Sequence, residues 1–388
     1  MIRSSYAFVN LVKATIGVGV FALPVAFKQA GLWTGLVLMF ALGVVNAHSL
    51  VKIVRCSQYL SKKIVANICV MGLQLGFCGA FYIFVVDHTK EVFDHIFSTN
   101  LSRGMLFFVA LPFFLLIGSI RNLVLLSWIG LTGNVLLVTS MTIILVKMIL
   151  MEHFPFSQLP AFTSIEGATL SAGSIIYAYA AQGVVLPLEN KMKKPKEMLG
   201  FLGVISTSST FIVVVYTATG FLGYITYGEE LKGSITLNLT NSPIDFAVKI
   251  MLLVMTYCGF PIEIYPVVEM FWPFVKQRFE GAGHCKIALV RYALQYAAVL
   301  LAFGLAYAIP NFKDIIPFIG ITSGMMLALI LPPILETVVF IGRWRKGSMV
   351  AFLYNLTHNI FYLILGIIFI VVGLYSNYRN LSESSRMD

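Results

Sequence analysis

Charge is the scarcest property of this sequence. Only 11% of its 388 residues are Asp, Glu, Lys or Arg, whereas 59% are hydrophobic, and soluble domains carry about 25% charged residues. No polar stretch longer than about 20 residues separates the apolar segments, which leaves no room for a second, water-soluble domain. We therefore expect an integral membrane protein formed by a single transmembrane domain over residues 1–388.

Cysteine is scarce as well, and its placement excludes further classes of protein. Cys69, Cys78 and Cys258 lie in apolar segments, and Cys56 and Cys285 lie beside basic clusters. This arrangement matches neither a disulfide framework nor the ligand spacing of a zinc site. No acid and base pair and no nucleophile with its base is recognisable either, so we expect no enzyme activity, no metal and no bound cofactor.

Long apolar segments fill the chain instead. Lipid offers no hydrogen-bond partners to a polypeptide backbone, and the segments lack the strict alternation of barrel strands, so each is expected to be a helix. Stretches of about 20 apolar residues predict an all-α protein with eleven transmembrane helices. These are expected near residues 6–27, 32–54, 66–97, 104–120, 122–149, 169–188, 199–226, 243–270, 287–309, 313–341 and 350–376.

The net charge of +10 reflects membrane topology, not nucleic-acid binding, because the basic residues form short clusters between apolar segments. Alternate loops hold 17 Lys and Arg residues on the side of the N-terminus, Lys52 and Arg55 included, against 6 on the other side. The positive-inside rule places the larger group and the N-terminus in the cytoplasm, and an odd number of spans places the C-terminus on the exoplasmic or luminal side. Sequons at Asn100, Asn238 and Asn380 fall on that side and are candidates for N-glycosylation.

Two apolar segments contain their own helix breakers. Residues 14–24 read ATIGVGVFALP, with Gly17 and Gly19 before Leu-Pro, and residues 180–190 read AAQGVVLPLEN. Glycine also serves helix packing, but a pair of interrupted segments in corresponding positions indicates an inverted-repeat transporter. The repeats are expected at about 6–149 and 169–341, with an additional helix at about 350–376.

A break inside the membrane frees backbone N–H and C=O groups that need new partners. A small zwitterion supplies them, because its carboxylate accepts from N–H groups at a half-helix N-terminus and its ammonium donates to freed carbonyls. We expect the substrate to bind at Thr15, Ile16, Gly17, Gly19, Tyr179, Gln182 and Gly183. Tyr177, Tyr257 and Tyr265 are expected to shape the side-chain pocket, although aromatic helix packing explains each of them better when it is taken singly.

The motifs cover essentially the whole chain. They are Lys13, Ile16, Gly17, Gly19, Leu23 and Pro24 in the first span, then KQAG at 28–31, QLGFC at 74–78, GVVLPLENKM at 183–192, SITLNL at 234–239 and LALILPPILE at 327–336. They resemble the proton-assisted amino acid transporter family of the amino acid/auxin permease superfamily. The resemblance implies a leucine-transporter-like fold with eleven spans, small neutral amino acids as substrates moved with protons, and a plasma or endolysosomal membrane.

Some positions depart from the family pattern. Ala14 and Thr15 stand where the family has Gly-Asn, and the Thr15 hydroxyl is expected to cap the half-helix. Asn10 stands where the family carries a histidine linked to proton coupling, and asparagine cannot titrate. Residues 179–183 read YAAQG in place of Phe-Glu-Gly-Ile-Gly, so a carboxylate near the substrate is lost. The proton machinery is therefore expected to have moved.

Intramembrane ionisable residues are the candidates to replace it. His48 is either a proton relay or a neutral histidine hydrogen-bonded between helices, and Glu263 is either a displaced protonation site or a neutral packing group. Asp87 and His88 are expected at a solvated exoplasmic mouth.

We expect a carrier for small neutral amino acids that works by alternating access in the lipid bilayer and is driven by a proton gradient. A sodium-coupled or uncoupled carrier, and an amino-acid sensor with little flux, remain alternatives, and the sequence leaves the oligomeric state open.

Overall fold

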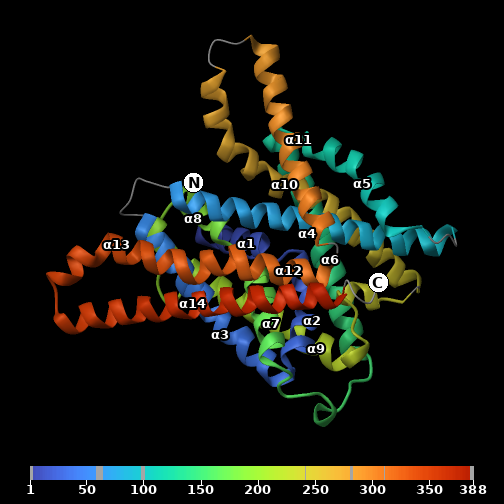
Figure 1. Ribbon diagram of the computed structural model, residues 1–388, viewed down its shortest axis with the longest axis horizontal. Helices are drawn as coiled ribbons and strands as arrows, with labels where there is room; N and C mark the ends of the chain where they lie inside the picture. Colours follow the sequence, from blue (N-terminus) through green and yellow to red (C-terminus); the bar gives the residue numbers. More distant parts are fainter. Residues whose placement is uncertain are drawn as a thin grey trace. The chain divides into compact units, whose positions relative to one another are not determined.

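The computed structural model describes residues 3–57, 64–97, 101–240, 242–279, 283–309 and 311–384. This part of the chain consists of helices joined by turns and by longer connections such as residues 151–164 (Figure 1). Nine helices in it are long and apolar enough to cross a membrane, and one bent pair makes a tenth candidate. The uninterrupted helices are α3 (Leu32–Ser57), α4 (Ile64–Phe97), α5 (Arg103–Gly118), α6 (Leu123–Leu150), α9 (Val204–Tyr227), α10 (Pro243–Arg278), α11 (His284–Ala308) and α14 (Met349–Ser384).

Three further segments are interrupted. α1 (Ser4–Thr15) and α2 (Leu23–Ala30) are joined by a 3-10 turn, Val18–Ala22, and α7 (Ile165–Tyr179) and α8 (Gln182–Lys191) by two residues. α12 (Phe312–Ile319) and α13 (Leu331–Arg345) are joined by two π-helical turns. The predicted breaks in the first and sixth spans therefore coincide with real helix ends.

One of the predicted spans corresponds to a short helix. α5 is apolar but has only 16 residues, which is shorter than the roughly 20 residues that a helix needs to cross the hydrocarbon core. The count of eleven spans therefore stays a prediction.

The outer faces of the long helices carry large apolar side chains. Val37, Val44, Leu116, Leu150 and Val371 are between 62% and 79% exposed. Soluble monomers rarely expose continuous apolar surface of this kind, whereas lipid requires it. The side-chain pattern therefore agrees with the membrane location inferred from composition.

The chain divides into two compact units. The first unit comprises Met1–Val70, Glu152–Leu231 and Ile316–Asp388, and the second comprises Met71–Met151 and Lys232–Ile315. Each unit takes segments from both halves of the sequence.

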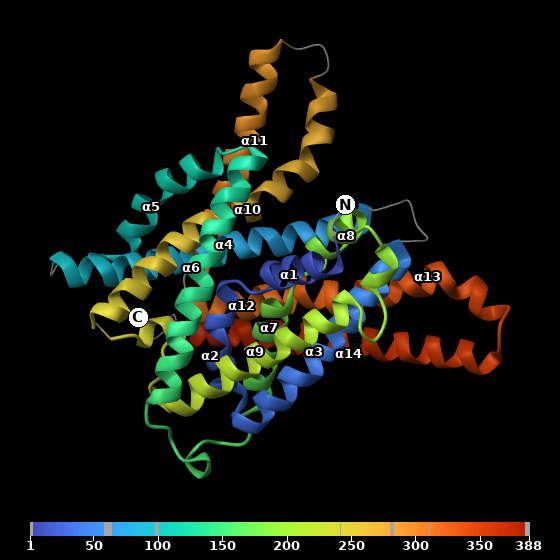
Figure 2. The ribbon, with the colours of Figure 1, turned by 180° about the vertical axis from the view of Figure 1, so that it is seen from behind.

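The first unit contains the interrupted helix near the N-terminus, α1 with α2, and the one in mid-chain, α7 with α8. Within it α2 packs on α7 and α9, α3 packs on α7, α9 and α13, and α13 packs on α14. Figures 1 and 2 show α13 and α14 running side by side in both views. A buried apolar cluster joins α1, α3, α8 and α9 and consists of Ala7, Leu11, Leu50, Val54, Ala181, Val185, Leu188, Met192, Met198, Val204 and Ile205.

Two glycines allow backbones in this unit to approach closely. A Cβ at Gly320 would lie 1.8 Å from the carbonyl oxygen of Gly173 on α7, so only hydrogen fits there. Gly31 ends α2 at φ +93, and a Cβ there would lie 2.8 Å from backbone atoms of Ala161. Left-handed backbone of this kind favours glycine, which explains the last residue of the KQAG motif.

The second unit is built around α10, which packs on α5, α6 and α11. The Tyr82 hydroxyl on α4 donates to the carbonyl of Phe107 on α5 at 2.5 Å, and the Tyr82 ring stacks on Phe114. Asp87 pairs with Arg103 at 2.6 Å.

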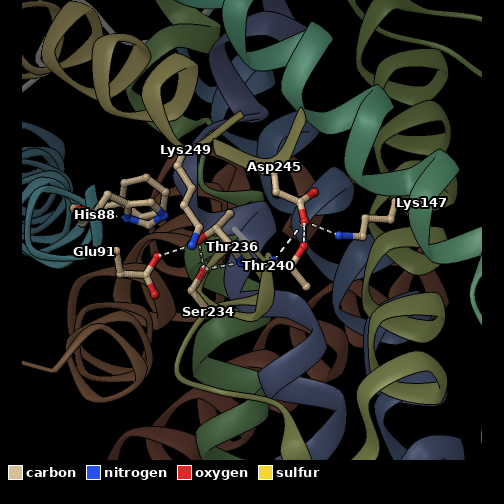
Figure 3. Close-up of polar contacts among 9 residues, drawn as sticks. His88, Glu91, Lys147, Ser234, Thr236, Thr240, Asp245 and Lys249 are labelled. Carbon is tan, nitrogen blue, oxygen red and sulfur yellow. Dashed lines mark hydrogen bonds and ion pairs between the residues drawn. The ribbon is translucent and has the colours of Figure 1, made fainter. Parts of the chain in front are cut away.

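Polar contacts also fix the chain that leads into α10 (Figure 3). Lys249 pairs with Glu91 of α4 at 3.1 Å. Buried Asp245 pairs with Lys147 of α6 and accepts from the N–H of Thr240 at 2.9 Å. Thr240, which directly follows the SITLNL segment, is therefore held against α10.

The expectation that Asp87 and His88 form a solvated mouth is wrong for His88. Its side chain is fully buried, its Nδ1 donates to the carbonyl of Phe84 at 2.8 Å, and its ring stacks on the Phe84 ring. A neutral imidazole can be buried in this way because its N–H finds a carbonyl one turn earlier in the same helix.

Candidate substrate site at two interrupted helices

The first break begins after Thr15. Ile16 has φ −77 and ψ 103, which is extended backbone, and Gly17 is also extended. The axes of the two half-helices, Ser4–Thr15 and Val18–Ala30, differ by 51°. The last backbone hydrogen bond before the break is donated by the N–H of Ile16 to the carbonyl of Val12. The first one after it is donated by the N–H of Val20 to the carbonyl of Gly17.

The second break begins with the same backbone geometry. Ala180 has φ −66 and ψ 103, close to the values of Ile16, and Ala181 follows at φ −126 and ψ 8. The N–H of Val184 then donates to the carbonyl of Ala181. Thr15 and Tyr179 thus occupy equivalent positions, each the last residue of a first half-helix.

The break in the first span leaves donors without backbone partners. Among the backbone hydrogen bonds of the described residues, none uses the N–H groups of Gly17, Val18 or Gly19. These groups stand at the N-terminus of the second half-helix, where the helix dipole is positive. A Cβ on Gly17 would meet no atom within 4 Å, whereas a Cβ on Gly19 would lie 3.0 Å from the ring of Tyr177.

Tyr216 of α9 joins the two breaks. Its hydroxyl lies 2.8 Å from the carbonyl oxygen of Thr15 and 3.0 Å from that of Ala178, and its side chain is fully buried. A hydroxyl has one proton to donate, so the two carbonyls share it. The C-terminal ends of both first half-helices are therefore held at one atom.

Asn46 of α3 spans the second break. Its amide donates to the carbonyl of Tyr179 at 3.1 Å and accepts from the amide of Gln182 at 2.8 Å. The residues on either side of the break are thus tied to one side chain. Gln182 is 4% exposed, and its Oε1 has no hydrogen-bond partner among the described residues.

The seven predicted binding residues all lie in the first unit, at the two breaks, but the Thr15 hydroxyl behaves differently from expectation. The Thr15 hydroxyl donates to the carbonyl of Leu11 in its own helix at 2.8 Å, and no side chain caps the second half-helix, so the expected cap is wrong. The Tyr179 hydroxyl donates to the carbonyl of Met39 on α3 at 3.2 Å. A threonine inside a helix readily bonds back to the carbonyl four residues earlier.

The two candidates for proton coupling lie in different units. His48 of α3 belongs to the first unit, where its Nδ1 lies 3.2 Å from the Tyr362 hydroxyl of α14. Glu263 of α10 belongs to the second unit and has Gln74 of α4 as a hydrogen-bond partner. Tyr257 and Tyr265, expected in the side-chain pocket, also lie in the second unit.

Sequence analysis missed Tyr216, Asn46 and Lys52. Each is a single polar residue in an apolar stretch, which the sequence shows. The sequence does not show their hydrogen-bond and ion-pair partners, because most of these lie more than 100 residues away along the chain. Lys52 was counted among the cytoplasmic loop residues, which is wrong, because it lies inside α3 with 1% of its surface exposed and pairs with Glu336 at 3.1 Å.

Two other sets of predicted residues are placed as follows. Asn100 lies outside the described residues, as does the side chain of Asn380, and Asn238 accepts from the N–H of Lys232 at 2.9 Å. In the described residues no group of three His, Cys, Asp or Glu side chains could hold a metal ion.

Residues 2–378 match the protein family described as "Transmembrane amino acid transporter protein". A Caenorhabditis elegans protein named "Probable amino acid transporter skat-1" is 27% identical over 423 residues, which cover 99% of this chain and 91% of the relative. A Drosophila melanogaster protein named "Proton-coupled amino acid transporter-like protein pathetic" is 27% identical over 380 residues, which cover 87% and 77%.

Solved structures of other transporters share the fold. The structure titled "Inward facing conformation of Mhp1" superposes with a TM-score of 0.58 at 10% identity, covering 99% of this chain and 92% of that chain. A Na+-coupled sialic acid symporter gives a TM-score of 0.55 at 13% identity, covering 97% and 89%. The helical, leucine-transporter-like architecture is therefore confirmed at the level of the fold.

The family predicted from the motifs is confirmed by these matches, and the relatives are named as transporters, not enzymes. The chain is an integral membrane protein that belongs to the transmembrane amino acid transporter family.

Proposed function

We propose that the protein carries small neutral amino acids across a membrane by alternating access about its two interrupted helices. One observation carries the proposal. The two breaks are joined through Tyr216. Beside them stand the N–H groups of residues 17–19 and Gln182 Oε1, none of which has a hydrogen-bond partner in the part of the chain that the structure describes. Donors at one break and an acceptor at the other suit the two ends of a zwitterion.

In this proposal the substrate carboxylate accepts from the N–H groups of Gly17, Val18 and Gly19. Its ammonium donates to Gln182 Oε1, a buried acceptor that gains by being paired. The remaining predicted residues, Thr15, Ile16, Tyr179 and Gly183, border the ligand. None of these side chains carries a charge, which favours substrates with neutral side chains.

The fold is proposed to be a 5+5 inverted repeat over about 6–149 and 169–341, with α14 as an added helix. In the first half of the chain, α1, α2 and α3 belong to the first unit and α4 and α5 lie mainly in the second. In the second half, α7, α8 and α9 belong to the first unit and α10 and α11 to the second. The last spans differ, because α6 lies in the second unit and α13 in the first. Counting α5 as a short span gives eleven spans in one transmembrane domain.

Transport is proposed to be coupled to protons through His48 or Glu263, because Asn10 has no titratable group. The name of the Drosophila relative also mentions proton coupling. The N-terminus is proposed to be cytoplasmic and the C-terminus exoplasmic or luminal in a plasma or endolysosomal membrane. Asn100, Asn238 and Asn380 are then on the side where N-glycosylation occurs.

Uptake into proteoliposomes tests the proposal. A panel of amino acids is supplied with and without pH and sodium gradients, and Gly17→Leu is compared with the wild type. Leucine at residue 17 would fill the space beside the N–H groups of residues 17–19, so we expect uptake to be lost while the protein still reaches the membrane. Gly304→Leu is the matched control, because a Cβ there also meets no atom within 4 Å and residue 304 is exposed on α11.

Undiminished uptake by Gly17→Leu would refute the site. Tight amino-acid binding by the wild type with no uptake would favour a sensor. Uptake that needs sodium and ignores the pH gradient would replace proton coupling by sodium coupling.

A further inference from the structure

Lys52 is a charged residue that the proposed transport site does not use. It lies inside α3, and its side chain is 1% exposed. A buried ammonium is tolerated only when its hydrogens are all bonded. The surroundings of Lys52 meet this condition with groups from two other helices.

Three acceptors surround the Lys52 ammonium. They are Glu336 Oε2 of α13 at 3.1 Å, His358 Nδ1 of α14 at 3.3 Å, and Asn359 Oδ1 of α14. The ring of Tyr362 lies 4.8 Å from the Lys52 nitrogen. An ammonium has three N–H bonds, so each acceptor receives one. We call Lys52, Glu336, His358 and Asn359 the lysine seat.

The lysine seat fixes the protonation of His358. Because Lys52 donates to Nδ1, that nitrogen must carry a lone pair, and the ring is neutral with its proton on Nε2. The ring of His48 lies 4.9 Å away from the His358 ring. The titratable and charged groups around these imidazoles are His48, Lys52, Arg55 and Cys56 of α3, Glu336 of α13, and Tyr354 and Tyr362 of α14.

One carboxylate therefore balances one ammonium, and the neutral ring of His358 and the ring of His48 lie alongside. Histidine is the side chain that changes its charge near neutral pH. A proton on His358 Nδ1 would remove the acceptor of one Lys52 hydrogen and place a second cation beside the first. The Nδ1 nitrogen of His358 can accept a hydrogen bond from Lys52 or bind an extra proton, but not both.

We propose that the lysine seat is an intramembrane proton-binding site in which Nδ1 of His358 takes up the proton and Lys52 is displaced from that nitrogen. The proton comes from the aqueous phase and binds to the lone pair of Nδ1. Lys52 keeps its three protons and loses one hydrogen bond, and the charge of the cluster rises from zero to +1. Release of the proton restores the neutral ring and the bond.

The seat is connected to the substrate site through α3. Asn46, which holds both sides of the second break, stands six residues before Lys52 in this helix, a distance of about 9 Å along the axis. The proton binds better to the conformation in which Lys52 no longer contacts His358. Proton binding therefore increases the population of that conformation. The inference rests on the proposed transport function for this coupling, and it adds His358, whose ring lies beside that of His48, to the groups that can bind the coupled proton.

The test measures two properties of the purified protein between pH 7.5 and 5.5, thermal unfolding in detergent and amino-acid uptake in proteoliposomes. Glutamine at residue 358 keeps an acceptor for Lys52 but cannot take a proton. We expect acid to lower the wild-type melting temperature and to change its uptake several-fold. Both effects should be lost in His358→Gln and kept in His153→Gln, which changes an exposed histidine outside the helices.

A double variant, Lys52→Met with Glu336→Gln, serves if His358→Gln does not fold. It removes the cation that opposes the proton, so acid should no longer lower the melting temperature. A wild-type pH response in either variant overturns the inference. Loss of the thermal response in His358→Gln, with no uptake by any form, would instead support the proton site and refute the proposed transport.

Discussion

Removing one oxygen atom from Tyr216 is the sharpest test of how the two breaks are held together. Tyr216→Phe keeps the ring, which packs against Tyr179 with ring centroids 5.2 Å apart, and deletes the hydroxyl shared by the carbonyls of Thr15 and Ala178. Nothing else in the site changes in composition. The variant therefore isolates the hydrogen bond.

The size of the effect follows from the geometry. Both carbonyls belong to the ends of buried half-helices, so losing their donor leaves an acceptor unpaired at a cost of about 1–3 kcal/mol. If the cost falls on the arrangement that binds substrate, each 1.4 kcal/mol weakens binding about tenfold. We expect KM for the amino acid to rise about 10-fold, with a smaller change in maximal rate.

Tyr224→Phe is the matched control. Tyr224 lies on the same helix and is equally buried, but its hydroxyl contacts Glu229 at 3.3 Å, away from both breaks. Radiolabelled uptake over a range of substrate concentrations gives KM for both variants. A KM for Tyr216→Phe within twofold of the wild type, or the same rise in both variants, would refute the reasoning.

Two further predictions concern packing and the second unit. Gly320→Ala should prevent correct folding, because its Cβ would lie 1.8 Å from the carbonyl oxygen of Gly173. Size-exclusion chromatography should show aggregation of this variant. Gly342→Ala is the control and should elute normally, because a Cβ there meets no atom within 4 Å. Asp245→Asn should lower stability by about 1–3 kcal/mol, because it weakens the pair between buried Asp245 and Lys147, whose side chain is 26% exposed. A melting temperature unchanged by Asp245→Asn would contradict the structural role of that pair.

The helix interruptions were predictable from sequence because their causes are local. Glycines followed by Leu-Pro mark a place where the backbone can leave helical geometry, and the same pattern occurs twice. The positions of Gly17 and Gln182 at real helix ends follow from these neighbours alone.

The partners across the site could not be predicted in this way. Tyr216 meets Thr15 from a distance of 201 residues along the chain, and Lys52 meets Asn359 from a distance of 307. Apolar periodicity shows which segments are helices but not which polar residues of two helices meet. The error on Lys52 arose because a lysine near a helix end normally extends to the membrane surface, and only its acceptors on α13 and α14 reveal otherwise.

The division of the chain into interleaved units has a consequence for biosynthesis. The second unit has all of its residues once position 315 has been made, whereas the first unit, which begins at residue 1, also needs residues 316–388. Until α14 is inserted, Lys52 lacks both of its acceptors on that helix. The helices made first must therefore remain in the bilayer without their final contacts until α14 has been synthesised. Such partly assembled intermediates are the species on which chaperones and quality control act.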